Sequence, residues 1–253
     1  MTLPLKHIAA ALTLCVATTL PFSAHALDDK QKEEFGAFIK EYLIANPEIM
    51  LDVQNALEAK QEQARQDKAT AAISDNKDEI FNSSSDLALG NPDGDVTIVE
   101  FFDYNCGYCK RALSDMDKVI SSDSNVRFVL KELPILGPDS VAAHKVSDAF
   151  RKLAPEKYAE FHRTLLGSQG RATEDSAIAV ATSLGVSEAD IRAQMASNPN
   201  DQSVRKTYQL ASNLGITGTP SYVVGDEALF GALGAELLEQ KVKDVRQCGG
   251  GGC

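Results

Sequence analysis

The sequence predicts an α/β protein in which a small sheet is interrupted by a block of helices and preceded by a separate helical segment. Three observations support this prediction. The run VTIVEFF is rich in Val, Ile and Phe, and a helical pattern and a second such run, VRFVLKEL, follow it. Residues 138–214 have helical spacing, and residues 28–80 are helical in composition almost throughout. The succession strand, helix, strand has the lengths of a parallel crossover unit.

The first 26 residues have the layout of a cleavable secretory signal. A basic start at Lys6 precedes an apolar run of about 15 residues, shorter than the roughly 20 that a membrane-spanning helix needs. The small-residue end AHA predicts cleavage after Ala26. A lipid anchor on Cys15 is the alternative, but Leu14 before it is larger than the small residue expected there. We therefore expect export to the periplasm.

The chain is strongly acidic and carries no basic cluster. Its net charge of −11 would become −12 once Lys6 leaves with the signal. This charge argues against nucleic acid or anionic lipid as a partner. The remaining 253 − 26 = 227 residues contain no second apolar run of membrane length and suffice for one domain with an appendage, so we expect a soluble mature protein.

Residues 27–80 form the predicted N-terminal helical segment, which Asn46-Pro47 divides into two helices. The first helix places an apolar face at Phe35, Phe38, Ile39, Tyr42 and Leu43, and the second continues with Met50, Val53 and Leu57. The coiled-coil pattern is partial, because Lys60 and Asp67 occupy companion positions of the seam. A solvated linker helix is one interpretation. We favour self-association, since a mostly polar helix gains little stability alone.

Residues 81–247 form the predicted main domain. A buried strand, Val96 to Phe102, leads through the cysteine motif into the helix KRALSDMDKVISS, and VRFVLKEL is the next strand. A helical insertion follows over about 138–214. Its predicted ends are N-caps at Thr173 and Ser187 and glycines at Gly167, Gly185 and Gly215. Two short strands around Gly225-Asp226 and a helix AELLEQKVKDV complete the domain.

Four of the five cysteines remain after export, as two close pairs, Cys106/Cys109 and Cys248/Cys253. Cys106 lies between a strand and a helix, where unpaired N–H groups and the helix dipole lower a thiol pKa. Cys109, one turn further, can attack a mixed disulfide on Cys106. A structural metal would need two further ligands at suitable spacing, and a staple over two residues closes too small a loop to stabilise much. The pattern therefore favours redox chemistry.

The motif VEFFDYNCGYC, followed about 110 residues later by GTP, resembles the DsbA-type thiol-disulfide proteins. The resemblance covers residues 85–247 and implies a thioredoxin fold with an inserted helical domain. It also implies that Pro220 is cis and faces the cysteines, and that the backbone of Thr219 pairs with an extended substrate segment. Pro220, Thr219 and Tyr108 are thus the expected substrate-binding residues, and no cofactor or metal is expected.

Glu100 is an acid in the middle of a strand that we expect to be buried, which would raise its pKa. A solvated residue at a sheet edge is the alternative. Proteins of the resembled type carry a buried acid at the matching place, so the resemblance implies proton transfer for Cys109. Lys131 on the next strand is a suggested partner for Glu100.

Two features bear on the direction of electron flow. Cys106-Gly-Tyr-Cys109 with Thr219 is similar to the DsbC-type isomerases and lacks the loop histidine that makes a disulfide more oxidising. The stretch EYLIANPEIMLDVQNALEAKQ resembles the N-terminal region of ScsC proteins, which implies a trimer, a periplasmic isomerase or reductase of misfolded exported proteins, and a membrane thiol reductase such as ScsB. The alternatives are a DsbA-like oxidase and a copper-binding or holdase module linked to copper tolerance.

The tail CGGGGC, residues 248–253, fits no part of the resembled pattern. Its glycines could let the cysteines close as a disulfide or bind a soft metal such as Cu(I). The simpler interpretation is an inessential flexible tail, because chain ends are commonly disordered. We assign it no site.

Overall fold

The computed structural model describes residues 28–84, 86–197 and 201–249. The predicted signal, 1–26, and Cys253 lie outside these residues. The chain divides into two compact units, with the boundary between Leu57 and Glu58. Within the described ranges, no helix combines the length and the apolar character that crossing a membrane requires.

The first unit contains α1 (Asp29–Ala45) and the beginning of α2 (Glu48–Asp75), so the helix break lies at Asn46-Pro47, as predicted. A capping box between Asp28 and Gln31 starts α1, which buries no residue. Five of its large apolar side chains are more than half exposed: Phe35, Phe38, Ile39, Tyr42 and Ile44. Leu43 is half-buried, so most, but not all, of the apolar face predicted for this helix is exposed among the described residues.

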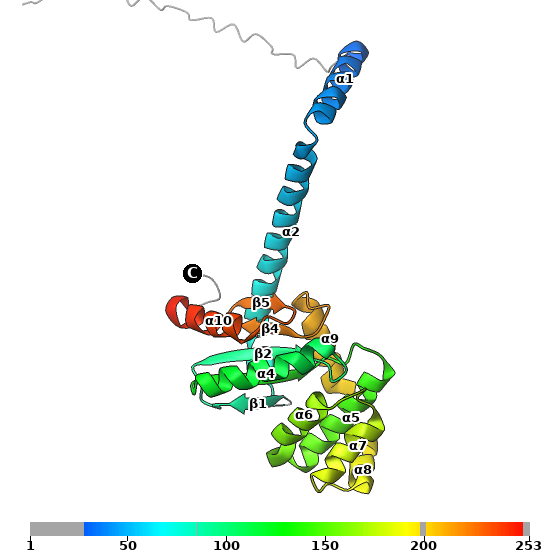
Figure 1. Cartoon of the computed structure of the whole chain (residues 1–253), viewed down its shortest axis with the longest axis vertical. Helices are drawn as coiled ribbons and strands as arrows, with labels where there is room; N and C mark the ends of the chain where they lie inside the picture. Colours follow the sequence, from blue (N-terminus) through cyan, green and yellow to red (C-terminus); the bar gives the residue numbers. More distant parts are fainter. Residues whose placement is uncertain (1–27, 85, 198–200, 250–253) are drawn as a thin grey trace, which may run out of the picture. The chain divides into compact units, whose positions relative to one another are not determined.

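The second unit is built on a five-stranded sheet in the order β1-β3-β2-β4-β5 (Figure 1). The strands are β1 (Leu87–Gly90), β2 (Val96–Phe102), β3 (Val126–Glu132), β4 (Ser221–Val224) and β5 (Glu227–Phe230). β2 and β3 are parallel, and the other neighbours are antiparallel. This is the mixed sheet of a thioredoxin fold, and β2, β3 and the short pair β4 and β5 were predicted from the sequence. The edge strand β1 was not predicted, because its residues LALG include none of the β-branched or aromatic residues that mark a strand.

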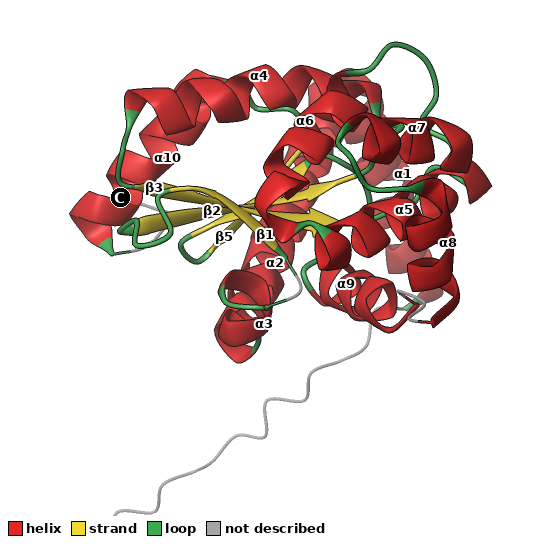
Figure 2. Cartoon of the chain, turned by 90° about the horizontal axis from the view of Figure 1, so that it is seen from below, coloured by secondary structure: helices red, strands yellow, loops and turns green. Residues whose placement is uncertain are grey.

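The sheet separates two apolar clusters. Ile98 and Phe102 of β2 pack with α4 (Gly107–Ser122) and α10 (Ala235–Cys248), whereas Val99 and Phe101 pack with α3 (Lys77–Phe81), α9 (Asp201–Asn213) and the end of α2. Figure 2 shows α4 and α10 on one side of the strands and α3 on the other. Successive side chains of a strand point to opposite faces, so Glu100, between Val99 and Phe101, shares the face of α4.

The predicted helical insertion joins β3 to β4. It consists of α5 (Pro138–Leu153), a short 3₁₀ turn (Pro155–Lys157), α6 (Tyr158–Gly167), α7 (Glu174–Ser183), α8 (Glu188–Ser197) and α9. Thr173 caps α7 in a capping box, and the Ser187 hydroxyl accepts the Asp190 N–H at 3.2 Å. Gly185 ends its helix with φ +91°, a conformation that favours glycine. The predicted caps of α7 and α8 are thus confirmed.

Candidate functional site

The turn between β2 and α4 presents the first cysteine. The Cys106 N–H donates to the Asp103 carbonyl at 3.0 Å, which closes a tight turn directly after the strand. Cys106 is then the N-cap of α4, and its sulfur accepts the Cys109 N–H at 3.4 Å. The sulfur therefore occupies the place where a helix offers free N–H groups to an anion.

Cys106 has the properties of a nucleophile. Its pKa is lowered to about 6, first by a hydrogen bond from the Cys109 side chain and further by the backbone N–H groups of Cys109 and Tyr108, although burial works in the opposite direction. Cys106 is 5% exposed and Cys109 is fully covered, so Cys106 is the cysteine of the pair that has contact with solvent. A thiolate near neutral pH at the accessible position is the reactive form.

Cys109 has the opposite character. Burial, the hydrogen bond to Cys106 and the nearby Glu100 all raise the pKa of Cys109 well above its ordinary value. Both cysteines are free thiols, so the site is described in its reduced state. The second thiol must therefore lose its proton to a neighbouring group before it can act.

Glu100 lies under the cysteines on the α4 face of the sheet and is 3% exposed, so it is not the solvated edge residue of the alternative interpretation. Burial, the Cys106 sulfur and Asp115 raise the pKa of Glu100 to about 8. A carboxyl group with this pKa can hold or release a proton near neutral pH.

Lys131 is not the partner of Glu100, which corrects the sequence-based suggestion. Its ammonium group forms a buried ion pair with Asp86 and donates to the Glu79 carbonyl at 2.6 Å. In the parallel pair, Leu130 is opposite Glu100 and Lys131 is opposite Phe101. The side chains of Glu100 and Lys131 therefore point to opposite faces of the sheet.

Thr219 and Pro220 complete the site from the other end of the domain. Their peptide bond is cis, as the resemblance implied, and they directly precede β4. The Cys106 thiol lies 3.0 Å from the Thr219 carbonyl oxygen, which it can donate to while protonated. Thr219 is half-buried and Pro220 is buried, so backbone rather than a large side chain is presented next to the sulfur.

Tyr108 is the most exposed of the residues predicted to bind substrate. The residue is 59% exposed, and the Arg111 guanidinium lies 4.3 Å from the ring centroid. A cation over an aromatic face is attractive and holds the side chain in place. The structure thus brings Cys106, Cys109, Glu100, Thr219, Pro220 and Tyr108 to one end of the sheet.

Sequence reasoning missed Asp103 and Asn105, whose side chains hold the turn. The Asp103 carboxylate accepts the Asn105 N–H at 2.8 Å and the Leu136 N–H at 3.0 Å. The Asn105 amide donates to the Ala172 carbonyl at 2.9 Å and accepts the Ala172 N–H at 2.7 Å. The signal was the run DYN before the cysteine, because Asp and Asn favour turns that bond to their own backbone.

These residues can carry out thiol-disulfide exchange. The Cys106 thiolate can attack a disulfide and form a mixed disulfide, and Cys109 can then attack Cys106 and close the pair, which transfers two electrons to the substrate. Within the described residues, no group of three or more His, Cys, Asp or Glu side chains could hold a metal ion. The arrangement has the chemistry of a thiol-disulfide oxidoreductase.

Comparison with protein families gives two matches. Residues 97–243 match the DSBA-like thioredoxin domain. Residues 31–64 match the copper resistance protein ScsC N-terminal domain. The two matches correspond to the two parts that the sequence resemblance distinguished.

Solved structures and curated proteins were compared with the chain as well. A thioredoxin-like oxidoreductase from Silicibacter pomeroyi is 38% identical with a TM-score of 0.65, over 68% of this chain and 99% of that chain. A linker-deletion mutant of Proteus mirabilis ScsC is 26% identical with a TM-score of 0.64, over 89% of this chain and 99% of that chain. Disulfide bond formation protein D of Bacillus subtilis is 27% identical over 151 residues, 56% of this chain and 68% of that protein. The chain spans about a quarter (24%) of the Na(+)/H(+) antiporter NhaA 1 of Salinispora arenicola, which it matches at 24% identity.

Proposed function

The chain belongs to the family of DsbA-like thioredoxin domains, and from this premise we propose that it is a periplasmic disulfide isomerase and reductase of exported proteins. The observation that supports the proposal is the difference in pKa and in exposure between the two thiols. Cys106 is accessible with a pKa of about 6, whereas Cys109 is buried with a raised pKa. An attacking thiolate and a protected resolving thiol are the parts that exchange requires.

The first step is attack of the Cys106 thiolate on a substrate disulfide. The S–S bond of the substrate breaks, one substrate sulfur becomes bound to Cys106, and the other leaves as a thiolate that takes a proton from water. The backbone of Thr219 beside the Cys106 sulfur supports an extended substrate segment held there. In isomerisation, another substrate cysteine then displaces Cys106, so no electrons are transferred overall.

The second route reduces the substrate and uses Glu100. Once Cys106 is bound in the mixed disulfide, its negative charge is gone, and that charge contributes to the raised pKa of Glu100. Glu100 then ionises more readily and can take the proton of Cys109. Cys109 attacks Cys106, the substrate leaves reduced, and the Cys106–Cys109 disulfide must be reduced again by a membrane thiol reductase, for which ScsB-like proteins are the expected class.

The N-terminal segment supports an assembly of several copies. Five large apolar side chains of α1 are more than half exposed, among them Phe38 at 63%, and the segment matches the ScsC N-terminal domain. Covering this face with the same face of further copies would remove these side chains from water. A trimer would place several Cys106 thiolates around one misfolded substrate and raise their effective concentration.

Refolding of a substrate with scrambled disulfides tests the proposal. The reduced full-length protein should restore the native pairing, and Cys106→Ser should abolish the activity because no mixed disulfide can form. Cys109→Ser should retain isomerisation by the first route but lose reduction by the second. Refolding by Cys106→Ser at the wild-type rate would exclude the mechanism.

A DsbA-like oxidase is the second candidate, and the low pKa of Cys106 is the observation that favours it. A stabilised thiolate stabilises the reduced pair, which makes the corresponding disulfide more oxidising. Thiol trapping in cells separates the two: a mainly reduced Cys106/Cys109 pair indicates an isomerase, and a mainly oxidised pair indicates an oxidase. Stoichiometric Cu(I) binding without exchange activity would instead support the copper-binding or holdase alternative.

A further inference from the structure

A buried polar network lies beside the nucleophile turn and takes no part in the exchange steps. Its members are Tyr104 from the turn, Glu132 at the end of β3, His144 and Ser147 from α5, and Tyr158 and His162 from α6. Tyr104, His144 and Ser147 are fully covered, and Tyr158 and His162 are nearly so. Burying so many polar groups is costly unless each finds a partner, so the network needs an explanation.

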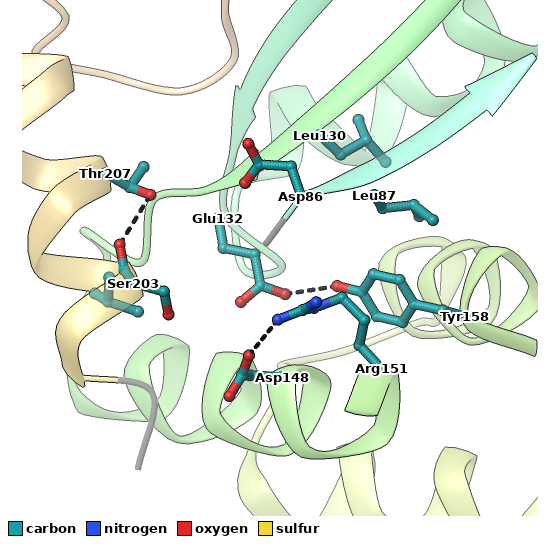
Figure 3. A pocket seen from close by; sticks show the side chains of 10 residues that line it. Asp86, Leu87, Leu130, Glu132, Asp148, Arg151, Tyr158, Ser203 and Thr207 are labelled. Carbon is teal, nitrogen blue, oxygen red and sulfur yellow. Dashed lines mark hydrogen bonds and ion pairs between the residues drawn. The ribbon is translucent and has the colours of Figure 1, made fainter. Parts of the chain in front are cut away.

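Glu132 is the charged centre of this network. Its carboxylate accepts the Ser147 hydroxyl at 2.5 Å and the Tyr158 hydroxyl at 2.7 Å. Burial alone would raise the pKa of Glu132, but His144 and these two hydroxyl groups lower it below its ordinary value. Figure 3 shows the Glu132 carboxylate at a pocket that Asp148 and Arg151 also line, together with its hydrogen bond to Tyr158. Glu132 is therefore an ionised acceptor.

His144 connects Glu132 to the turn that carries the nucleophile. Its Nδ1 atom lies 3.2 Å from the Glu132 carboxylate, and its Nε2 atom accepts the Tyr104 N–H at 3.4 Å. An imidazole nitrogen that accepts a hydrogen bond carries no proton, so the proton of the neutral ring is on Nδ1, facing Glu132. The carboxylate thus selects the tautomer that can hold the Tyr104 backbone.

Tyr104 is the second residue of the turn that Cys106 closes. Its hydroxyl lies 2.9 Å from the Ser147 hydroxyl and 3.4 Å from His162 Nδ1, so both its backbone and its side chain are held by the helical insertion. Burial lowers the pKa of His162 to about 3, so this second imidazole is neutral as well. The ionisable groups around His144 are thus Glu132 from β3, His162 from α6, Tyr158 from the start of α6 and Tyr104 from the turn.

We propose that His144, with its tautomer fixed by Glu132, is a positioning residue that orients the Cys106 sulfur by holding the Tyr104 N–H. The Cys106 thiolate depends on N–H groups of Tyr108 and Cys109, whose direction follows from the turn before them. A turn that is free to move would align these donors less well and stabilise the thiolate less. The helical insertion would then tune the nucleophile without touching a reacting atom.

Titration of the Cys106 thiolate in reduced full-length protein tests this inference, followed by ultraviolet absorbance and by the rate of alkylation with iodoacetamide. His144→Leu removes the acceptor and should raise the pKa of Cys106 by about one unit. Alkylation would then be about tenfold slower at pH 5 and nearly unchanged at pH 8.5, where both proteins are mostly thiolate. His144→Gln offers an amide oxygen to the Tyr104 N–H and should recover most of the wild-type titration.

Tyr158→Phe is the matched control. It removes buried hydrogen bonds to Glu132 and Ser147 but leaves the His144 contact with the turn in place. It should lower the melting temperature and leave the titration of Cys106 unchanged. An unchanged titration in folded His144→Leu, or an equal shift in Tyr158→Phe, would overturn the proposal.

The wild-type protein gives a test that does not depend on whether His144→Leu folds. After removal of the predicted signal, only two of the four histidines remain, His144 and His162, so their imidazole ¹⁵N signals can be assigned with one variant. The signals of His144 should show a protonated Nδ1 and a bare Nε2, and a protonated Nε2 would contradict the inference. None of these measurements uses a protein substrate, so they are independent of whether the chain isomerises, reduces or oxidises disulfides.

Discussion

The Cys106 sulfur lies 3.0 Å from the carbonyl oxygen of Thr219, a residue 113 positions further along the chain. This contact joins two segments that are far apart in the sequence, because the helical insertion lies between β3 and the strand that follows Pro220. The nucleophile and the backbone that can hold a substrate are therefore placed together only when the whole sheet is formed.

The Cys109 side chain is the largest cause of the lowered pKa of Cys106. Cys109→Ala removes this hydrogen bond and should raise the pKa of Cys106 above about 6, so that alkylation at pH 6 becomes several-fold slower. Cys109→Ser keeps a donor in the same place and should shift the titration less. Thiolate absorbance as a function of pH measures both variants, and equal titrations of Cys109→Ala and wild type would contradict this prediction.

Glu100→Gln should slow the step in which Cys109 resolves a mixed disulfide, by about tenfold or more, because a carboxamide cannot take the thiol proton. The first attack by Cys106 should be little changed. Rapid quenching and separation under non-reducing conditions would show a mixed disulfide that accumulates in the variant. Glu227→Gln exchanges a carboxylate on β5 that is paired with Lys241, and this control should behave as wild type.

The raised pKa of Glu100 also predicts the pH dependence of stability. Its folded pKa of about 8 exceeds the unfolded value near 4.5, so the folded state prefers the protonated form. Stability from this group is fully present below about pH 4.5 and is lost progressively as the pH rises to about 8, by up to about 5 kcal/mol. Urea unfolding should therefore find that Glu100→Gln gains stability relative to wild type between pH 5 and pH 8.5. A constant difference over this range would indicate an ordinary carboxyl pKa.

Lys131→Met should destabilise the domain by about 3 kcal/mol, since it leaves the Asp86 carboxylate buried without its cation. The double variant with Asp86→Asn removes both charges and should recover much of the loss. Denaturant unfolding measures each change. Alkylation of Cys106 should be the same in both variants as in wild type, because the Lys131 side chain lies on the face of the sheet opposite Glu100. A changed alkylation rate would mean that Lys131 acts on the active site after all.

Phe38→Asp should reduce the size of the proposed assembly, because it places a charge on the apolar face of α1. Lys40→Glu changes charge on the opposite side of the same helix and is the matched control, expected to retain the wild-type mass. Light scattering at several concentrations gives the mass of each. A wild-type protein that is already monomeric would remove the basis for a trimer without affecting the exchange chemistry.

Much of the fold could be predicted because strands, helices and their caps depend on residues that are close together in the sequence. The bounds of β2 follow from one apolar run, and the caps of α7 and α8 follow from Thr173 and Ser187. The wrong suggestion about Lys131 came from treating neighbouring strands as one surface, whereas alternate residues face opposite sides. The positioning role inferred for His144 could not be found in this way, since it contacts a backbone N–H 40 positions away.

The sequence by itself determined that two cysteines sit where a strand passes into a helix, and hence that Cys106 occupies a helix N-terminus. That conclusion needs only the backbone geometry of adjacent residues. The tertiary structure decided how the two thiols differ and which groups surround them. Burial removes Cys109 and Glu100 from water, and it requires segments that are far apart in the chain. The same is true of the contact between Cys106 and Thr219 and of the hydrogen bond from the Tyr104 N–H to His144. Such burial and contacts exist only once the chain has folded.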